Sequence, residues 1–551
     1  MAENNFNGQR VLLLPEGSDR LVGRDAQRTN IAVAVAVANA VKTTLGPKGM
    51  DKMLVSDLGD ITITNDGATI LEEMNVEHPV AKIMVNVAKT QDTEVGDGTT
   101  SVIIMAGSFL KGADDLIEQG IHPTIIIRGY KMAAEKAEEV LNKISKKIDI
   151  NDTATLEKIG MVAEGSKNIG NEETKKHITE IAIDAIKQVM TKDSEGKIYV
   201  DKDFIKVEKK AGANVANTEL IKGVLIDKEV AHPQMPKKIT DGKIALLDVA
   251  LEIEKTETDA RIEITSPEQM QSFLQQEEKM LKEMVDRISK SGANVVFTQK
   301  GIDDVAQHYM AKAGIMAVRR IKRSDMEKLA KATGAKMVTS LDDLNANDLG
   351  FAGVIEERKI SGEQMIFVEK CKDPKSVSIF IRGGSQQVID EVERSITDLL
   401  GALTTAIEDG RYVVGGGSTE TEVAEQLRAY ASEIGGREQL AIQKFADALE
   451  QIPEVLAQSA GMDPIDTIVQ IRSKHKNNEG KSYGVDVYKG AINNMLEAGV
   501  VEPTKMKVQE IYSASEAAEM ILRIDDMISS KSKGGPGGAG MPQGGMGEPM
   551  E

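Results

Sequence analysis

The chain contains little cysteine, few aromatic side chains and no long apolar run. Its 551 residues include one cysteine, Cys371, which excludes an intramolecular disulfide framework and a cysteine-only zinc site. Its six histidines show no metal-ligand spacing. The longest apolar run, residues 31–38, is far shorter than the roughly 20 residues that a membrane-spanning helix needs. With no tryptophan and 3% aromatic residues, the core has to rest on Ala, Val, Ile, Leu and 26 methionines.

An excess of positive charge is also missing. Lys and Arg number 68 against 87 Asp and Glu, which gives a formal net charge of −19. Because nucleic-acid phosphates are bound by clustered Lys and Arg, a nucleic-acid coat protein is not expected. A nucleotide is compatible with this charge, since a few backbone N–H groups and a metal ion can hold phosphates. The start of the chain shows no signal-peptide pattern. We therefore expect a soluble, cytoplasmic protein that binds neither nucleic acid nor membrane.

An alanine-rich segment near the start of the chain has an ambiguous pattern. Residues 31–38 alternate with period 2, as a strand would. Alanine favours helices, however, and no turn residue interrupts residues 31–45, so we predict a helix. We expect it to begin at an Asp25 cap, to end near Gly46 and, being apolar all round, to be buried on every side.

The middle of the chain differs in pattern from its two ends. Residues 221–370 alternate strand-like segments with helices, which is typical of an α/β domain. The strand-like segments are 244–249, 294–297 and 316–318, and the helices include 303–313 and 325–333. The ends, up to about residue 145 and from about 400 to 530, are predicted to be mostly helical, with helices at 76–90 and 99–119 among them. The ends are therefore predicted to form one domain into which the middle is inserted, with a charged connecting region over 146–220.

A helix with an unusual apolar stripe is predicted to begin at Ser266. Ser266-Pro267-Glu268-Gln269 has the sequence of a capping box with proline at the first helical position. Apolar residues follow at helical spacing: Met270, Phe273, Leu274, Met280, Leu281, Met284, Val285 and Ile288. The stripe either faces a core or belongs to a projecting helix that offers Met and Phe to partners.

The commonest phosphate-binding motifs are absent or misplaced. Gly480-Lys481-Ser482 lacks the upstream glycine of a Walker A loop, because position 475 is histidine. A GxGxxG pattern occurs only at 535–540, within a Gly/Met/Pro-rich tail at 531–551 that we predict to be disordered.

Three other glycine-rich clusters precede or follow predicted helices, at 45–49, 96–100 and 415–418. A glycine turn that opens a helix presents free N–H groups and the positive end of the helix dipole to phosphate. Asp97, placed among such donors, suits Mg²⁺, which prefers oxygen ligands, and Thr99 and Thr100 add hydroxyl donors. Any one cluster could be an ordinary turn, but all three lie in the two chain ends that we assign to one domain.

These clusters and several other motifs resemble the group II chaperonins, the thermosome group of the TCP-1/cpn60 family. The matching segments are 45–53, 64–69, 96–100, 299–303, Glu393-Arg394-Ser395 with Asp398, and 415–417. The resemblance extends over about residues 10–530, and the Gly/Met-rich tail is similar to that of archaeal members. It departs from the family pattern at Val414, Ser418 and Leu399, and residues 160–170 match only weakly.

The resemblance implies a multidomain fold of α and α/β parts. A mostly helical equatorial ATP-binding domain would comprise 1–147 and 405–530, and a small intermediate hinge domain 148–218 and 370–404. An α/β apical domain that binds clients would comprise 219–369, with a helical lid protrusion at about 252–285.

The resemblance also implies roles for individual residues. Leu45, Gly46 and Pro47 would line the nucleotide pocket, and Gly98, Thr99, Thr100 and Ser101 would hold phosphates. Gly416, Gly417 and Glu502 would face the ribose, and Lys167 would sense the γ-phosphate. Asp97 would bind Mg²⁺. Asp66 and Asp398 would be catalytic and would position and activate the attacking water, a task suited to carboxylates in phosphoryl transfer.

We therefore expect an ATP-dependent, Mg²⁺-dependent chaperone in which copies of the chain or of paralogues form a stacked double ring around unfolded clients. Two alternatives are a structural ring or filament stabilised by nucleotide and an ATP-hydrolysing enzyme for a small substrate. A purely structural protein does not need Asp398 as a water-positioning carboxylate. The small-substrate enzyme would need a second catalytic cluster within 221–370, and the sequence shows none.

Overall fold

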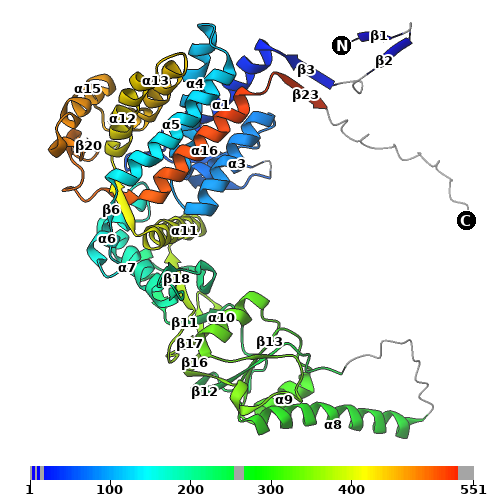
Figure 1. The fold of residues 1–551 in the computed structure, drawn as a ribbon. Coiled ribbons are helices and arrows are strands. Elements are labelled where there is room, and N and C mark those ends of the chain that lie inside the picture. Colours follow the sequence, from blue (N-terminus) through cyan, green and yellow to red (C-terminus); the bar gives the residue numbers. More distant parts are fainter. Residues whose placement is uncertain (1–2, 7–8, 13–17, 57, 254–265, 531–551) are drawn as a thin grey trace, which may run out of the picture.

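The computed structural model describes the chain except for residues 1–2, 7–8, 13–17, 57, 254–265 and 531–551. The tail predicted to be disordered and part of the predicted lid protrusion therefore lie outside the described residues. The protein mixes helices and sheets in three packed units, which follow one another along a curved molecule (Figure 1). We call them the helical unit, the small unit and the α/β unit.

The helical unit draws its core from both ends of the chain, within residues 31–141 and 413–522. Helix α16 from the C-terminal end packs against α3, α4 and α5 from the N-terminal end (Figure 1). The helices are α1 (Arg24–Lys42), α2 (Gly67–Glu73), α3 (Pro79–Val95), α4 (Thr99–Glu118), α5 (Pro123–Ile144), α12 (Ser418–Ile434), α13 (Glu438–Leu449), α14 (Gln451–Ser459), α15 (Pro464–His475) and α16 (Thr504–Leu522). One apolar core thus contains residues from both ends of the chain.

The two chain ends that form this unit also contain short paired strands. β3 (Ser18–Val22) pairs with β23 (Asp526–Ser530), and β4 (Lys52–Val55) pairs with β5 (Ile61–Thr64), both antiparallel. The remaining strands are β1 (Glu3–Phe6) with β2 (Gln9–Leu12), β20 (Tyr483–Asp486) with β21 (Ala491–Asn494), and β22 (Val501–Pro503), β19 (Arg411–Val414) and β6 (Lys146–Lys147) in one small sheet. The β3–β23 pair therefore joins the two ends of the chain beside the helical unit (Figure 1).

The alanine-rich segment is a helix, as predicted, but its ends and its burial differ from the prediction. Helix α1 has Gly23 rather than Asp25 at its cap, and it ends at Lys42. Beyond its C-cap Thr43, the N–H and the hydroxyl of Thr44 both donate to the carbonyl of Val41, at 3.0 and 2.8 Å, so the helical i−4 pattern has ended before Gly46. One face is buried and the other is not: Ala32 and Ala36 are exposed, which the small alanine methyl tolerates at little cost.

The helix predicted over 76–90 also begins later than predicted, at Pro79, and runs on to Val95. His78 is its N-cap: the ring accepts a hydrogen bond from the N–H of Val80, and Pro79 takes the first helical position. The predicted helix at 99–119 is α4, with nearly the predicted bounds.

The α/β unit has a core that lies within residues 224–368 and is built around a seven-stranded sheet. The sheet order is β11-β17-β16-β12-β13-β14, with β15 also pairing with β12. Its strands are β11 (Gly223–Ile226), β12 (Lys238–Leu247), β13 (Val295–Thr298), β14 (Met316–Val318), β15 (Met337–Val338), β16 (Gly350–Ile360) and β17 (Glu363–Glu369). β12, β13 and β14 are parallel, and α9 (Asp304–Lys312) and α10 (Arg323–Thr333) connect them to the following strands, so the predicted α/β pattern is present.

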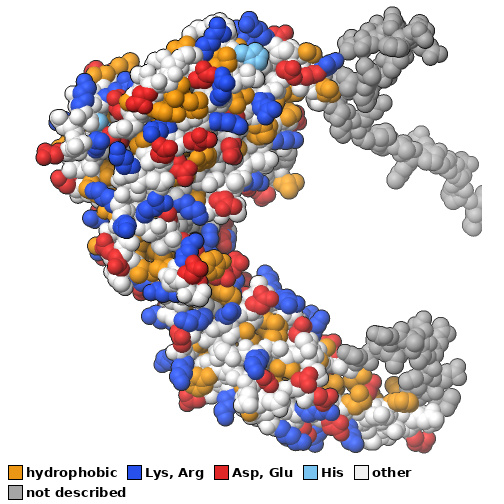
Figure 2. Space-filling model, viewed as in Figure 1, with side chains coloured by type: hydrophobic (Ala, Val, Ile, Leu, Met, Phe, Trp, Pro, Cys, Tyr) orange, Lys and Arg blue, Asp and Glu red, His pale blue; other side chains and the backbone are white. Residues whose placement is uncertain are grey.

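Helix α8 (Pro267–Ser291) combines both interpretations of its apolar stripe. Its C-terminal half buries Leu281, Val285 and Ile288 in the core of the α/β unit. Its N-terminal half projects beyond the sheet, and there Met270 is 49% and Leu274 55% exposed (Figure 1). Figure 2 shows hydrophobic side chains at this outer end of the helix.

The small unit lies between the other two units. The chain runs through it twice, once toward the α/β unit and once on the way back to the helical unit. Its core combines residues within 156–205 with residues within 377–407. It comprises α6 (Thr153–Ala163), α7 (Glu172–Val189), α11 (Gln386–Asp409) and a sheet of β10 (Glu219–Ile221), β18 (Val377–Gly383) and β9 (Ile205–Ala211), with the hairpin β7 (Thr191–Lys192) and β8 (Ile198–Tyr199). Helix α11 also contacts α3 and α16 of the helical unit, so it reaches from one unit to the other.

Across the described residues, no helix combines the length and the apolar composition needed to cross a membrane.

Candidate active site

A cavity of about 530 Å³ opens where the helical unit faces the α6–α7 loop of the small unit. All three glycine-rich clusters contribute to its wall. Of the predicted site residues, these line it: Leu45, Gly46, Pro47, Asp66, Asp97, Gly98, Thr99, Thr100, Ser101, Lys167, Gly416, Gly417 and Glu502. The remaining predicted residue, Asp398, reaches the cavity through an ion pair with Lys167. The structure thus brings together the predicted residues from segments far apart in the sequence.

Two helices present their N-termini at this cavity without a side-chain cap. Helix α4 follows Gly98 and α12 follows Gly417, and both glycines have left-handed backbone conformations, with φ of 82° and 76°. By contrast, α2 and α3 have capping side chains that accept a backbone N–H. Uncapped N–H groups and the positive dipole ends of two helices make this part of the cavity suitable for an anion such as phosphate.

Asp97 lies beside the N-terminus of α4. Its carboxylate accepts the N–H of Gly98 at 2.6 Å, and its backbone carbonyl accepts the side-chain amide of Gln91 at 3.0 Å. Burial raises the pKa of Asp97 above its ordinary value. Among the described residues, no group of three or more His, Cys, Asp or Glu side chains could hold a metal ion by itself. A single carboxylate beside a phosphate site fits Mg²⁺, which typically takes one or two carboxylates and completes its shell with phosphate oxygens and water.

Asp66 caps helix α2 at the edge of the cavity. Its carboxylate accepts the N–H of Thr69 at 2.8 Å and the hydroxyl of Thr99 at 3.1 Å. Burial works to raise the pKa of Asp66, but Lys167 and the Thr69 and Thr99 hydrogen bonds outweigh it and lower that pKa. Asp66 is therefore held ionised and fixed in orientation.

Lys167 and Asp398 form a buried pair across the boundary between loop and helix. The Lys167 ammonium lies 2.6 Å from Asp398 and 3.9 Å from Asp66, and Lys167 and Asp398 are only 6% and 7% exposed. Burial works against the charge on Lys167, but Asp398 and Asp66 outweigh it and raise its pKa. Burial raises the pKa of Asp398, and Lys167 opposes that rise. One cation thus holds the two predicted catalytic carboxylates, one from each side of the cavity.

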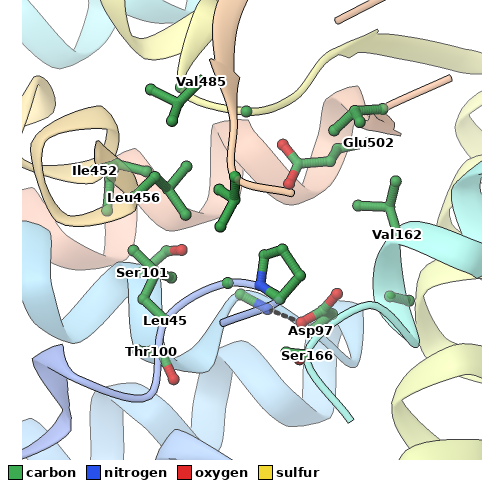
Figure 3. Close-up of a pocket in the computed structure, with 18 of the residues that line it drawn as sticks. Leu45, Asp97, Thr100, Ser101, Val162, Ser166, Ile452, Leu456, Val485 and Glu502 are labelled. Atoms are coloured by element: carbon green, nitrogen blue, oxygen red, sulfur yellow. Dashed lines mark hydrogen bonds between the residues drawn. The ribbon is translucent and has the colours of Figure 1, made fainter. Parts of the chain in front are cut away.

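The cavity has an apolar side and an acidic side. Figure 3 shows Ile452, Leu456 and Val485 together on one side, while the carboxylates of Asp97 and Glu502 lie on the other. The apolar side suits a planar ring, and the acidic side suits hydroxyl groups and a cation.

A buried group of charges at Lys507 was missed by the sequence analysis. Its ammonium lies 2.9 Å from Glu420, 2.9 Å from Glu502 and 3.3 Å from Glu510. Burial raises the pKa of Glu510 to about 8, although Lys507 pulls it down. One feature of the sequence could have indicated part of this group. Lys507 and Glu510 are three residues apart, so they lie on one helical face, and they follow Glu502 closely in the sequence. No local pattern links Glu420, on α12, to them.

The fold and the cavity define a multidomain protein with a cavity suited to a nucleotide, where the Lys167–Asp398 pair of the small unit meets Asp66 of the helical unit. The sequence profile of the TCP-1/cpn60 chaperonin family matches residues 37–532. The thermosome subunit of Methanopyrus kandleri is 57% identical over 525 residues, which cover 95% of this chain and 96% of that protein. The thermosome subunit of Pyrococcus horikoshii is 57% identical over 537 residues, which cover 97% of each chain. The thermosome subunit alpha of Archaeoglobus fulgidus is 56% identical over 527 residues, which cover 96% of each chain.

The chain therefore belongs to the TCP-1/cpn60 chaperonin family. It is an ATP-dependent chaperone for protein folding, and its enzymatic activity is ATP hydrolysis.

Proposed function

We propose that the protein forms stacked double rings in the cytoplasm, from copies of itself or with paralogous subunits, and encloses unfolded client proteins. Some of its relatives are named as alpha or beta thermosome subunits, which supports an assembly of like chains. ATP binding and hydrolysis in the helical unit would drive the α/β unit and its projecting helix α8 to close over the enclosed client.

The proposed domains follow the three cores. Residues 1–147 and 405–530 would be the equatorial domain, 148–218 and 370–404 the intermediate domain, and 219–369 the apical domain with its protrusion at about 252–285. The core of the helical unit, which draws on both chain ends, supports the first assignment. The exposed outer half of α8 supports a lid or client-binding role for the protrusion, because exposed Met and Leu side chains adapt to varied partners.

The proposed chemistry divides between the two sides of the cavity. The N-termini of α4 and α12 would hold the phosphates, with Thr99, Thr100 and Ser101 adding donors. Asp97 would hold Mg²⁺, which neutralises charge on the phosphates when bound. The apolar side would take the base, and Glu502 would accept ribose hydroxyls. Asp66 and Asp398 would orient the attacking water and accept its proton.

The observation that carries this proposal is the 2.6 Å contact between Lys167 and Asp398. Both belong to the small unit, yet their partner Asp66 belongs to the helical unit, so movement of the small unit would assemble or dismantle the hydrolytic site. A structural ring or filament protein has no use for such a device. In a small-substrate enzyme, a second polar cavity in the α/β unit would be expected.

Electron microscopy of the purified protein, with and without ATP, tests the proposal. We expect double rings whose open ends close when ATP is added and hydrolysed. Single subunits, open filaments or rings that keep one shape with ATP would contradict it. Addition of an unfolded client should yield density inside the closed rings, which a purely structural ring would not show.

A further inference from the structure

The loop between α6 and α7, residues 164–171, carries Lys167 to the cavity and is fastened on the side of the helical unit. The side-chain amide of Asn65, the residue before Asp66, donates to the backbone carbonyl of Ser166. On the other side, Lys175 donates to the backbone carbonyl of Glu164 at 2.8 Å. The backbone that supports Lys167 is therefore fixed from two directions.

A third contact joins this loop to α11. The hydroxyl of Ser395 donates to the carboxylate of Glu164 at 2.6 Å, and each residue is 1% exposed. Ser395 lies one helical turn before Asp398, and Glu164 lies the same number of residues before Lys167. The hydrogen bond therefore runs beside the 2.6 Å ion pair between Lys167 and Asp398, and the two contacts together fix how the loop and the helix are aligned.

A carboxylate is a costly residue for this position. The loop and α11 belong to a core of Ile, Leu, Val and Ala side chains, where an unpaired charge is strongly destabilised. Burial raises the pKa of Glu164 to about 7, against hydrogen bonding from Ser395 and the attraction of Lys167 and Lys175, while Asp97 across the cavity raises it further. A neutral side chain would avoid this cost, so stability alone does not account for Glu164.

We propose that Glu164 and Ser395 are a positioning pair that aligns Asp398 with the cavity for attack of water on the terminal phosphate of ATP. Neither side chain lines the cavity, so both act through Lys167 and Asp398. The inference rests on the hydrolytic role proposed above for Asp398. When Glu164 is ionised, its hydrogen bond from Ser395 is charge-assisted and stronger than the bond to the neutral acid.

Two substitutions separate the hydrogen bond from the charge. Ser395→Ala removes the donor and leaves almost no cavity, and we expect kcat for ATP hydrolysis to fall roughly tenfold. The dissociation constant for ATP should stay within about twofold, because the phosphate-binding helix termini belong to the helical unit. Glu164→Gln keeps an acceptor for Ser395 but cannot ionise. Wild-type kcat should rise as pH increases through 7, and Glu164→Gln should show a smaller rise, because Asp398, whose pKa burial also raises, still contributes.

The measurements are steady-state ATP turnover from pH 6 to 8, ATP affinity and the thermal unfolding temperature of the assembled protein. Thr397→Ala is the matched control, since Thr397 lies on the same helix but is exposed to solvent. Slow turnover with unchanged ATP affinity supports the positioning pair. Wild-type kcat in Ser395→Ala, an unchanged pH profile in Glu164→Gln, or equal losses of turnover and ATP affinity would each overturn it.

Asp398→Ala distinguishes this inference from the proposal on which it rests. If Asp398→Ala retains turnover, the hydrolytic role of Asp398 is wrong and the positioning pair falls with it. If Asp398→Ala is inactive while Ser395→Ala and Glu164→Gln behave as wild type, only the positioning pair is wrong.

Discussion

Replacing Asp398 with alanine tests the hydrolytic geometry directly. The substitution removes a carboxylate that lies 2.6 Å from the Lys167 ammonium in a nearly inaccessible position. Lys167 would keep Asp66 as a carboxylate neighbour at 3.9 Å, so its charge would not be left wholly uncompensated. We therefore expect a loss of stability of about 3 kcal/mol, the lower end for a broken buried ion pair, rather than failure to fold.

The expected effect on the reaction is at least as large and is measured separately. Loss of a positioned general base costs roughly 10²–10⁴ in rate, which corresponds to about 3–5 kcal/mol of transition-state stabilisation. ATP affinity should change by no more than about threefold, because the phosphates would be held by helix termini that Asp398 does not contact. The affected quantity is therefore kcat, with the binding constant largely preserved.

The assay compares steady-state ATP turnover and ATP affinity in the assembled wild-type and variant proteins. Asp390→Ala is the matched control: Asp390 lies on α11 two turns earlier, where its carboxylate pairs with Lys209 at 2.7 Å, away from the cavity. Turnover of Asp398→Ala within about threefold of wild type would refute the reasoning, as would a loss of ATP affinity as large as the loss of turnover.

Three further outcomes are expected. Asp97→Ala should weaken ATP binding in the presence of Mg²⁺ and reduce the difference between calorimetric titrations with and without Mg²⁺; an unchanged Mg²⁺ dependence would reject the metal role. Gly401→Ala should push α11 away from the helical unit, because the new Cβ would lie 2.5 Å from the Cα of Gly96, and should lower the unfolding temperature and turnover together. Deleting residues 256–276 in favour of a short Gly/Ser loop should leave soluble subunits with ATPase activity, since the inward-facing Leu281 remains, but an enclosed client should then be digested by added protease in the presence of ATP. Insoluble subunits would show instead that the outer half of α8 is needed for the fold.

The parts of the site that local chemistry demands could be predicted from the sequence. A glycine turn that opens a helix is visible in the sequence, and Gly98 and Gly417 both have the left-handed backbone that glycine adopts without strain, each directly before a helix N-terminus suited to phosphate. Asp97 could be selected from the sequence as a candidate Mg²⁺ ligand because it stands among the N–H donors of such a turn. Lys507 and Glu420 were missed because they meet only where the folded chain brings the first turns of α16 and α12 together. Neither segment's own sequence indicates that the other lies close to it.

The errors in the predicted fold also arise because the sequence of one segment does not show which other segments pack against it. An all-apolar stretch such as residues 31–38 shows that a helix is compatible with burial, but not which face the neighbouring helices cover, so Ala32 and Ala36 are exposed against expectation. In α8, apolar residues recur at helical spacing in both halves, although only the second half is buried in the core of the α/β unit. Apolar periodicity shows which side chains of a helix can be buried. How many of them are buried depends on how far the surface that the helix packs against extends along it.

The order in which the cores close has a consequence for synthesis of the chain on the ribosome. The core of the α/β unit lies within residues 224–368, so it is complete as soon as that stretch has emerged. The helical unit begins first and finishes last, because α3, α4 and α5 pack against α16 near the other end of the chain. Its N-terminal helices can pack against one another, as α1 does with α4, but the faces that meet α16 must wait while most of the protein is translated. During its own biogenesis this chaperone subunit thus exposes the kind of apolar surface that it would later enclose in others.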